Sequence, residues 1–149
     1  MNVFGMMSLT GSALTAERVR AEVVASNMAN AETTRTSSGG PYQRQHVVFQ
    51  EAGGFAGVMH GQGVGSGMGM NVPAGGVEVS GVVTDASAPL ERYDPGHPDA
   101  DASGYVAYPD INPLTEMVDL MGATRAYGLN ASALQAEKGM LSASLELLK

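Results

Sequence analysis

Apolar residues recur at alternating spacings of three and four in two long stretches, one at each end of the chain. The first stretch runs from Phe4 to about Asn30, and the second runs from Asn112 to the C-terminus. This spacing is typical of the contact face of a coiled coil, so both stretches are predicted to be α-helices. A helix of about 36 residues is roughly 50 Å long, which is too long for a compact globule of this chain length. We therefore expect the two helices to pair with each other and with neighbouring molecules.

The apolar members of these two stripes form a predicted assembly seam, the surface expected to contact other helices. Its members are Phe4, Met7, Leu14, Met28, Met117, Leu120, Tyr127, Leu134, Leu141, Leu145 and Leu148. The start of the second helix is well marked, because Asn112 is a good N-cap and Pro113 suits the first helical position. Glu116 places negative charge near the positive end of the helix dipole.

The segment between the helices alternates short strand patterns with turn residues. Val77–Thr84 begins with strict alternation of apolar and polar residues, and residues 42–50, 105–108 and, more weakly, 90–93 are further candidate strands. Residues 53–76 are rich in glycine and are predicted to form a flexible arm. The chain is therefore predicted to be an α+β protein in three parts. These are an N-terminal axial helix (1–34), a small β-rich, loop-rich middle domain (35–111) and a C-terminal axial helix (112–149), the helices pairing as a coiled coil.

Composition argues against several classes of protein. Eight Lys and Arg against fifteen Asp and Glu give a net charge of -7, whereas a nucleic-acid binder needs a basic surface. The absence of cysteine excludes disulfides, thiolate metal sites and a cysteine nucleophile. The N-terminus lacks a basic region before its apolar residues, so it is a poor cleavable signal. We expect the protein to stay in the cell or to leave it by a route that removes nothing.

Two motifs resemble ligand sites. Alternating glycines from Gly61 to Gly69 suggest a phosphate-binding loop, but no strand, helix or Lys-Ser/Thr accompanies them in the required order. Residues 99–110 nearly match a twelve-residue calcium loop, with Asp99, Asp101 and Ser103 as oxygen ligands. Because Pro98 precedes the loop and prevents an entering helix, an Asp- and Gly-rich turn is favoured. A calcium-binding module remains an alternative, as does a cytoplasmic coiled-coil adaptor.

The three histidines share no metal-ligand spacing, and no nucleophile elbow supports a catalytic triad. We therefore expect no enzymatic activity, no catalytic residues, no cofactor, no bound metal and no small-molecule substrate.

Motifs spread over nearly the whole chain resemble one protein family. They are Gly11-Ser-Ala-Leu14, Ala25-Ser-Asn-Met-Ala-Asn-Ala-Glu-Thr33, Pro41-Tyr-Gln-Arg-Gln45, Tyr93-Asp-Pro-Gly-His-Pro-Asp-Ala-Asp101, Gly104-Tyr-Val-Ala-Tyr-Pro109 and Asn112-Pro-Leu-Thr-Glu-Met-Val-Asp119. Together they resemble the bacterial flagellar rod and hook axial protein family, and within it the proximal rod proteins of the basal body. The residues taken to carry this family motif are Asn27, Asn30, Pro41, Tyr42, Asp94, Pro95, Gly96, His97, Pro98, Gly104, Tyr105, Asn112, Pro113, Glu116 and Met117.

The resemblance implies a structural subunit of the flagellar rod, the drive shaft that transmits torque for motility. It implies type III export without cleavage of a signal peptide and helical assembly in the periplasm. The implied partners are copies of the chain itself, other rod subunits and, at the base of the rod, the membrane-embedded MS-ring and the export apparatus.

Overall fold

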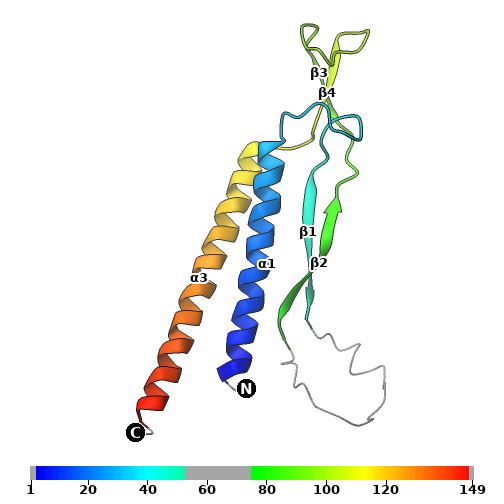
Figure 1. Cartoon of the computed structure of the whole chain (residues 1–149). Helices are drawn as coiled ribbons and strands as arrows, with labels where there is room; N and C mark the ends of the chain where they lie inside the picture. The colour runs from blue at the N-terminus through cyan, green and yellow to red at the C-terminus, as the bar shows by residue number, and fades with distance from the viewer. Residues whose placement is uncertain (1–2, 53–74, 148–149) are drawn as a thin grey trace, which may run out of the picture. The chain divides into compact units, whose positions relative to one another are not determined.

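The structure, a computed structural model, describes residues 3–52 and 75–147. In chain order its elements are α1 (Val3–Ala29), β1 (Gln45–Glu51), β2 (Val77–Thr84), β3 (Leu90–Tyr93), β4 (Tyr105–Tyr108) and α3 (Pro113–Glu146) (Figure 1). Two long helices with two small sheets between them confirm the predicted α+β class. Each predicted strand is present, and only the first is displaced, to 45–51.

Each of the two sheets contains two strands. β3 pairs antiparallel with β4, and Leu90 lies opposite Tyr108 while Tyr93 lies opposite Tyr105. β1 pairs with β2. The backbone hydrogen bonds beyond the ends of this pair run from Ala52 N to Gly76 O and from Asp85 N to Arg44 O. These partners show that β1 and β2 are also antiparallel.

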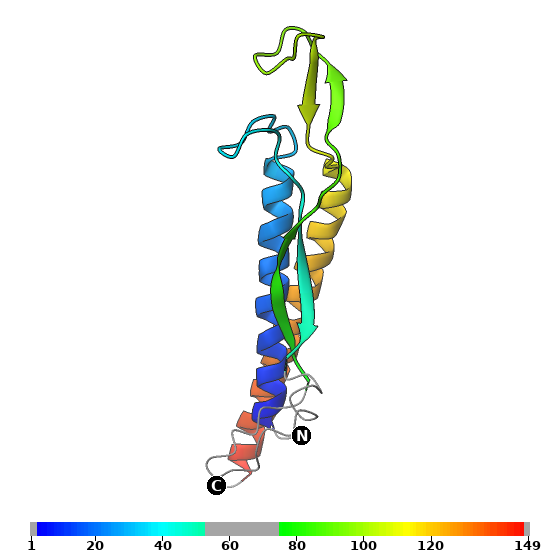
Figure 2. The same ribbon diagram turned by 90° about the vertical axis from the view of Figure 1, so that its right-hand side faces the viewer.

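The chain divides into two compact units, and both long helices contribute to each of them. The first unit comprises Met1–Val19, Val48–Gly81 and Thr124–Lys149. Within it the segments of α1 and α3 lie side by side and antiparallel (Figures 1 and 2). Thr10 Oγ1 on α1 donates a hydrogen bond of 2.9 Å to Glu137 Oε1 on α3. Of the apolar side chains described in this unit only Ala16 is buried, so a single chain gives it little hydrophobic core.

The second unit comprises Arg20–Val47 and Val82–Ala123. Its buried apolar residues are Val24 on α1, Val106 and Tyr108 on β4, Ile111 before α3, and Ala123 on α3. The Arg92 guanidinium lies 4.0 Å from the centre of the Tyr108 ring. Its Nη2 also donates a hydrogen bond of 2.7 Å to Tyr108 Oη.

The start of α3 follows the predicted local chemistry, and a polar side chain lies at the end of α1. α3 begins at Pro113, and Leu114 N donates to Asn112 Oδ1 at 3.0 Å, which confirms Asn112 as the N-cap. α1 ends at Ala29, and Asn30 Nδ2 donates to Ser26 O at 2.9 Å. The Asn30 backbone N–H donates to the same carbonyl at 3.1 Å, so the side chain adds a second hydrogen bond at the end of α1. Within the described parts of the chain no helix combines the length and apolar character needed to cross a membrane.

Candidate functional site

Four side chains, those of Asn27, Tyr42, Arg44 and Glu116, form a buried polar cluster with the backbone of Gln45 in the second unit. They come from the end of α1, the segment leading into β1, the first residue of β1 and the first turns of α3. Asn27 and Glu116 are each only 1% exposed. Polar groups buried this deeply are costly unless they are hydrogen-bonded, so their partners decide whether the cluster is stabilising.

Asn27 uses the whole hydrogen-bonding capacity of its amide. Nδ2 donates to Gln45 O at 2.8 Å and to Glu116 Oε2 at 3.1 Å. Oδ1 accepts from Gln45 N at 2.9 Å and from Tyr42 Oη at 3.1 Å. An amide offers two donors and two acceptor lone pairs, and all four are engaged here. Asn27 therefore joins α1 to the backbone of β1 and to α3 at one point.

The buried charge of Glu116 is compensated by Arg44. Arg44 Nε lies 2.7 Å and Nη2 2.5 Å from Glu116 Oε1. Arg44 Nη2 is also 3.7 Å from Asp119 Oδ2, and Arg20 Nη2 is 3.8 Å from Asp119 Oδ1. Close, hydrogen-bonded pairing of this kind is what offsets the desolvation of a buried carboxylate. Arg44 is thus the residue on which the buried charge of Glu116 depends.

A second group of motif residues forms the loop between β3 and β4. Asp94 N donates to Gly104 O at 2.9 Å, and His97 N donates to Asp94 O at 3.2 Å. Gly104 has a φ of +82°, and a Cβ at this position would lie 2.9 Å from Tyr93 Cε2. Both the backbone angle and the lack of space require glycine here. The loop is therefore a turn with a defined conformation.

The candidate calcium ligands serve this turn instead. Asp101 Oδ1 accepts hydrogen bonds of 2.8 Å from the backbone N–H groups of Ser103 and Tyr105. Asp99 Oδ2 accepts from Thr34 Oγ1 at 2.8 Å, and Asp99 Oδ1 lies 3.4 Å from Arg35 Nη1. Among residues 3–52 and 75–147, no three His, Cys, Asp or Glu side chains are grouped so as to hold a metal ion. These contacts favour the turn over the calcium-binding alternative.

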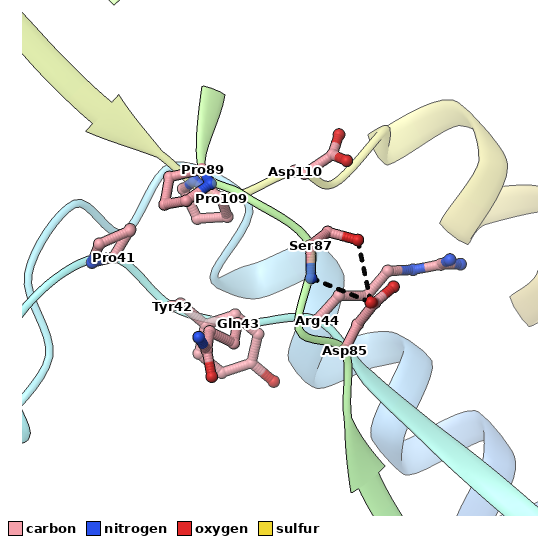
Figure 3. Close-up of a pocket in the computed structure, with 9 residues that line it drawn as sticks. All are labelled: Pro41, Tyr42, Gln43, Arg44, Asp85, Ser87, Pro89, Pro109 and Asp110. Carbon is pink, nitrogen blue, oxygen red and sulfur yellow. Dashed lines mark hydrogen bonds between the residues drawn. The ribbon is translucent and has the colours of Figure 1, made fainter. Parts of the chain in front are cut away.

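A small hollow lies beside the polar cluster (Figure 3). It is lined by Pro41, Tyr42, Gln43, Arg44, Asp85, Ser87, Pro89, Pro109 and Asp110. Its volume of about 10 Å³ has room for about one water molecule and not for an organic substrate. The pKa of Asp85 is lowered, mainly because the Ser87 hydroxyl donates to its carboxylate and also because His46 and the Ser87 backbone N–H donate to it.

The structure distributes the motif residues over distinct places. Asn27, Tyr42 and Glu116 meet in the polar cluster, while residues 94–98, Gly104 and Tyr105 shape the β3–β4 loop. Asn112 and Pro113 start α3, whereas Met117 is 49% exposed.

Sequence reasoning missed Arg44 and Gln45 as members of the cluster. The available signal was charge, because Arg44 is the one Lys or Arg between residues 36 and 84.

The predicted assembly seam does not contain the most buried helix positions. Those positions are Thr10, Ala16, Val24, Asn27, Glu116, Ala123 and Glu137, all small, β-branched or hydrogen-bonded. Among the seam residues, Phe4, Met117, Tyr127 and Leu145 are exposed; Met7, Leu14, Met28, Leu120, Leu134 and Leu141 are half-buried; and Leu148 lies outside the described residues. Residues 53–74 of the predicted glycine-rich arm also lie outside them.

Comparison with known proteins gives consistent matches along the chain. Residues 7–35 match the family model described as "Flagella basal body rod protein", and residues 102–147 match that described as "Flagellar basal body rod FlgEFG protein C-terminal". The chain is 44% identical over 154 aligned residues to the flagellar basal-body rod protein FlgC of Bacillus subtilis, with both chains fully covered. It is 35% identical to the FlgC protein of Borreliella burgdorferi, covering 100% of this chain and 99% of the relative. It is 36% identical to that of Salmonella typhimurium, covering 99% and 98% respectively.

Proposed function

Because the chain belongs to the FlgC family of flagellar basal-body rod proteins, we propose that its buried polar cluster and its exposed helix faces serve a structural subunit of the rod. The protein is a structural component of the basal body and not an enzyme. It assembles with other components of the rod. The main observation in support of this role in the rod is the polar cluster, because at Asn27 it connects three separate segments of the chain.

A subunit of a rotating shaft must resist bending and twisting at its joints. Asn27 and Arg44 hold the end of α1, the start of β1 and the start of α3 through short, directional hydrogen bonds. Directional bonds between buried groups fix orientation more strictly than apolar contact does. The cluster accordingly acts as a rigid joint of the second unit when torque passes through the subunit.

The helix faces supply the contacts with neighbouring subunits. Phe4, Met117, Tyr127 and Leu145 are exposed in the single chain, although burial of such side chains is favourable by roughly 1.5–3 kcal/mol each. We assign the assembly seam to contacts with copies of this chain and with other rod subunits. Identical head-to-tail contacts whose rotation does not close produce an open helix, which is the form of a rod.

The location follows from the same assignment. The assembled subunit lies in the periplasmic part of the basal body, next to the membrane-embedded MS-ring and the export apparatus at the base of the rod. The same proposal includes export without cleavage of a signal peptide.

Deletion and complementation test this function. Deleting the gene should abolish swimming, and basal bodies purified from the deletion strain should lack the rod. Complementation with the parent chain should restore both, and mass spectrometry of the basal bodies should find the chain with its N-terminus intact. Motile deletion cells with complete rods, or a chain confined to the cytosol as a discrete oligomer, would contradict the proposal and favour the adaptor.

A further inference from the structure

Within the first unit, the start of strand β2 is attached to helix α1 through Ser12. Val77 N donates a hydrogen bond of 3.2 Å to Ser12 Oγ. The Ser12 hydroxyl in turn donates to Leu9 O one turn earlier in the same helix, at 2.7 Å. The serine is therefore oriented by its own helix and presents its oxygen as an acceptor to the strand.

The backbone next to Val77 comes unusually close to this serine. A Cβ at Gly76 would lie 3.2 Å from Ser12 Oγ, 3.4 Å from Ala52 Cβ and 3.9 Å from Ser12 Cβ. Only glycine allows this approach without displacement of a neighbour. Ala52 N donates to Gly76 O at 2.9 Å, so this contact also lies where the β1–β2 pairing ends.

We propose that Ser12 and Gly76 form an intrachain latch, which fixes the end of the β1–β2 sheet to the chain's own α1 and stays closed in the assembled protein. Because of the latch, each β1–β2 sheet is attached to α1 of its own chain. The sheet therefore cannot exchange between neighbouring subunits. The Ser12 side of α1 is thereby closed to other subunits. The statement about the assembled protein rests on the proposed rod function.

The absence of native cysteine makes the latch directly testable by crosslinking. The Cβ separation of 3.9 Å between positions 12 and 76 falls within the usual range of about 3.5–4.5 Å for disulfides. The double variant Ser12→Cys/Gly76→Cys is compared with Ser12→Cys/Gly81→Cys, because a Cβ at Gly81 would have no atom within 4 Å. Both full-length chains are expressed in the deletion strain, and basal bodies are purified and mildly oxidised.

The latch predicts that thiol labelling is lost in the 12/76 variant and retained in the 12/81 control. It also predicts that the oxidised 12/76 chain runs as a monomer on a non-reducing gel. A disulfide-linked dimer, or labelling equal to that of the control, would overturn the latch. Absence of the parent chain from basal bodies purified in parallel would instead contradict the rod function. If only the 12/76 variant is absent from basal bodies, the same labelling of the purified full-length variants decides on the latch.

A second comparison separates the latch from a general packing defect. Gly76→Ala should reduce swimming because the new methyl group meets Ser12 Oγ at 3.2 Å. Ser12→Ala removes that oxygen, so the double variant Ser12→Ala/Gly76→Ala should swim better than Gly76→Ala alone. A double variant that swims worse than either single variant would overturn the proposed contact.

Discussion

Asn27 and Glu116 lie 89 residues apart in the sequence, yet Asn27 Nδ2 donates a hydrogen bond of 3.1 Å to Glu116 Oε2. Both side chains are almost completely buried. The second carboxylate oxygen of Glu116 is held by Arg44. The amide thus orients one oxygen of Glu116 and the guanidinium neutralises the other, so that a charged side chain is accommodated between two helices.

Removing Arg44 should therefore destabilise the second unit strongly. Arg44→Ala leaves the Glu116 carboxylate buried without its cation, and we expect a loss of about 3 kcal/mol in the free energy of unfolding. Urea unfolding of the full chain, followed by circular dichroism, measures this loss. Arg35→Ala is the matched control, since the Arg35 side chain is 77% exposed and its pairing with Asp99 is worth about 1 kcal/mol at most. Equal losses in the two variants would contradict the assigned role of Arg44.

Gly104 should matter more than the aspartates of the same loop. Gly104→Val places a β-branched side chain at a φ of +82° and against Tyr93, which should cost about 1–3 kcal/mol or more. Asp99→Asn keeps an oxygen for the Thr34 hydroxyl and should be nearly neutral. Thermal unfolding of both variants gives the comparison, with Gly96→Ala as the control because the nearest atom to its Cβ would be 3.7 Å away. A large loss in Asp99→Asn, reproduced by a calcium chelator in the parent chain, would restore the calcium hypothesis.

Charge in the assembly seam should block rod formation. Leu134 and Leu141 are half-buried in the single chain, and Leu134→Asp or Leu141→Asp would bring an unpaired charge into a contact that assembly completes. Burial of such a charge costs several kcal/mol, so neither variant should restore swimming in the deletion strain. The circular dichroism of the soluble chain should be unchanged. Glu146→Lys at an exposed position outside the seam is the control and should support swimming. Motility of both aspartate variants would show that the seam lies elsewhere.

Asp85 should respond to loss of its serine partner. The Ser87 hydroxyl donates to Asp85 Oδ1 at 2.9 Å and is the main reason why the pKa of Asp85 is lowered. A carboxyl group with a lowered pKa stabilises the fold above its unfolded-state pKa, and this contribution disappears as the pH falls through the folded-state value. Ser87→Ala should therefore raise the pKa of Asp85, measured by NMR titration of its side-chain carboxyl carbon. An unchanged pKa would assign the shift to His46 and to the Ser87 backbone N–H.

The local elements could be predicted from the sequence because each has a local cause. Asn112 followed by Pro113 specifies the start of α3, and alternation in residues 77–84 specifies β2. The pairing of β3 with β4 was less evident because Leu90–Tyr93 is short and exposed throughout. Residues 90–93 are connected to a buried side chain through Tyr108, which lies opposite Leu90.

The polar cluster could not be predicted in the same way. The sequence suggests a role for Glu116 at the helix dipole, whereas its main partner is 72 residues away in the chain. Hydrophobic spacing also favours large apolar residues over small ones as contact positions, and it therefore does not identify Thr10 and Ala123 as buried positions. Pairing across such separations depends on the tertiary fold, which no local pattern encodes.

The long separations within the polar cluster also set the order in which the chain can fold. Asn27 and Arg44 are synthesised early, but the carboxylate that they bind belongs to residue 116 of a 149-residue chain. Until that residue is available, the bond from Asn27 Nδ2 to Glu116 and the ion pair of Arg44 with Glu116 cannot form. Contacts of this separation also form slowly, because a long loop must close before any bond is gained. The second unit thus completes its folding only when most of the chain is present. A newly made chain therefore stays extended for longer than a chain whose fold is built from local contacts.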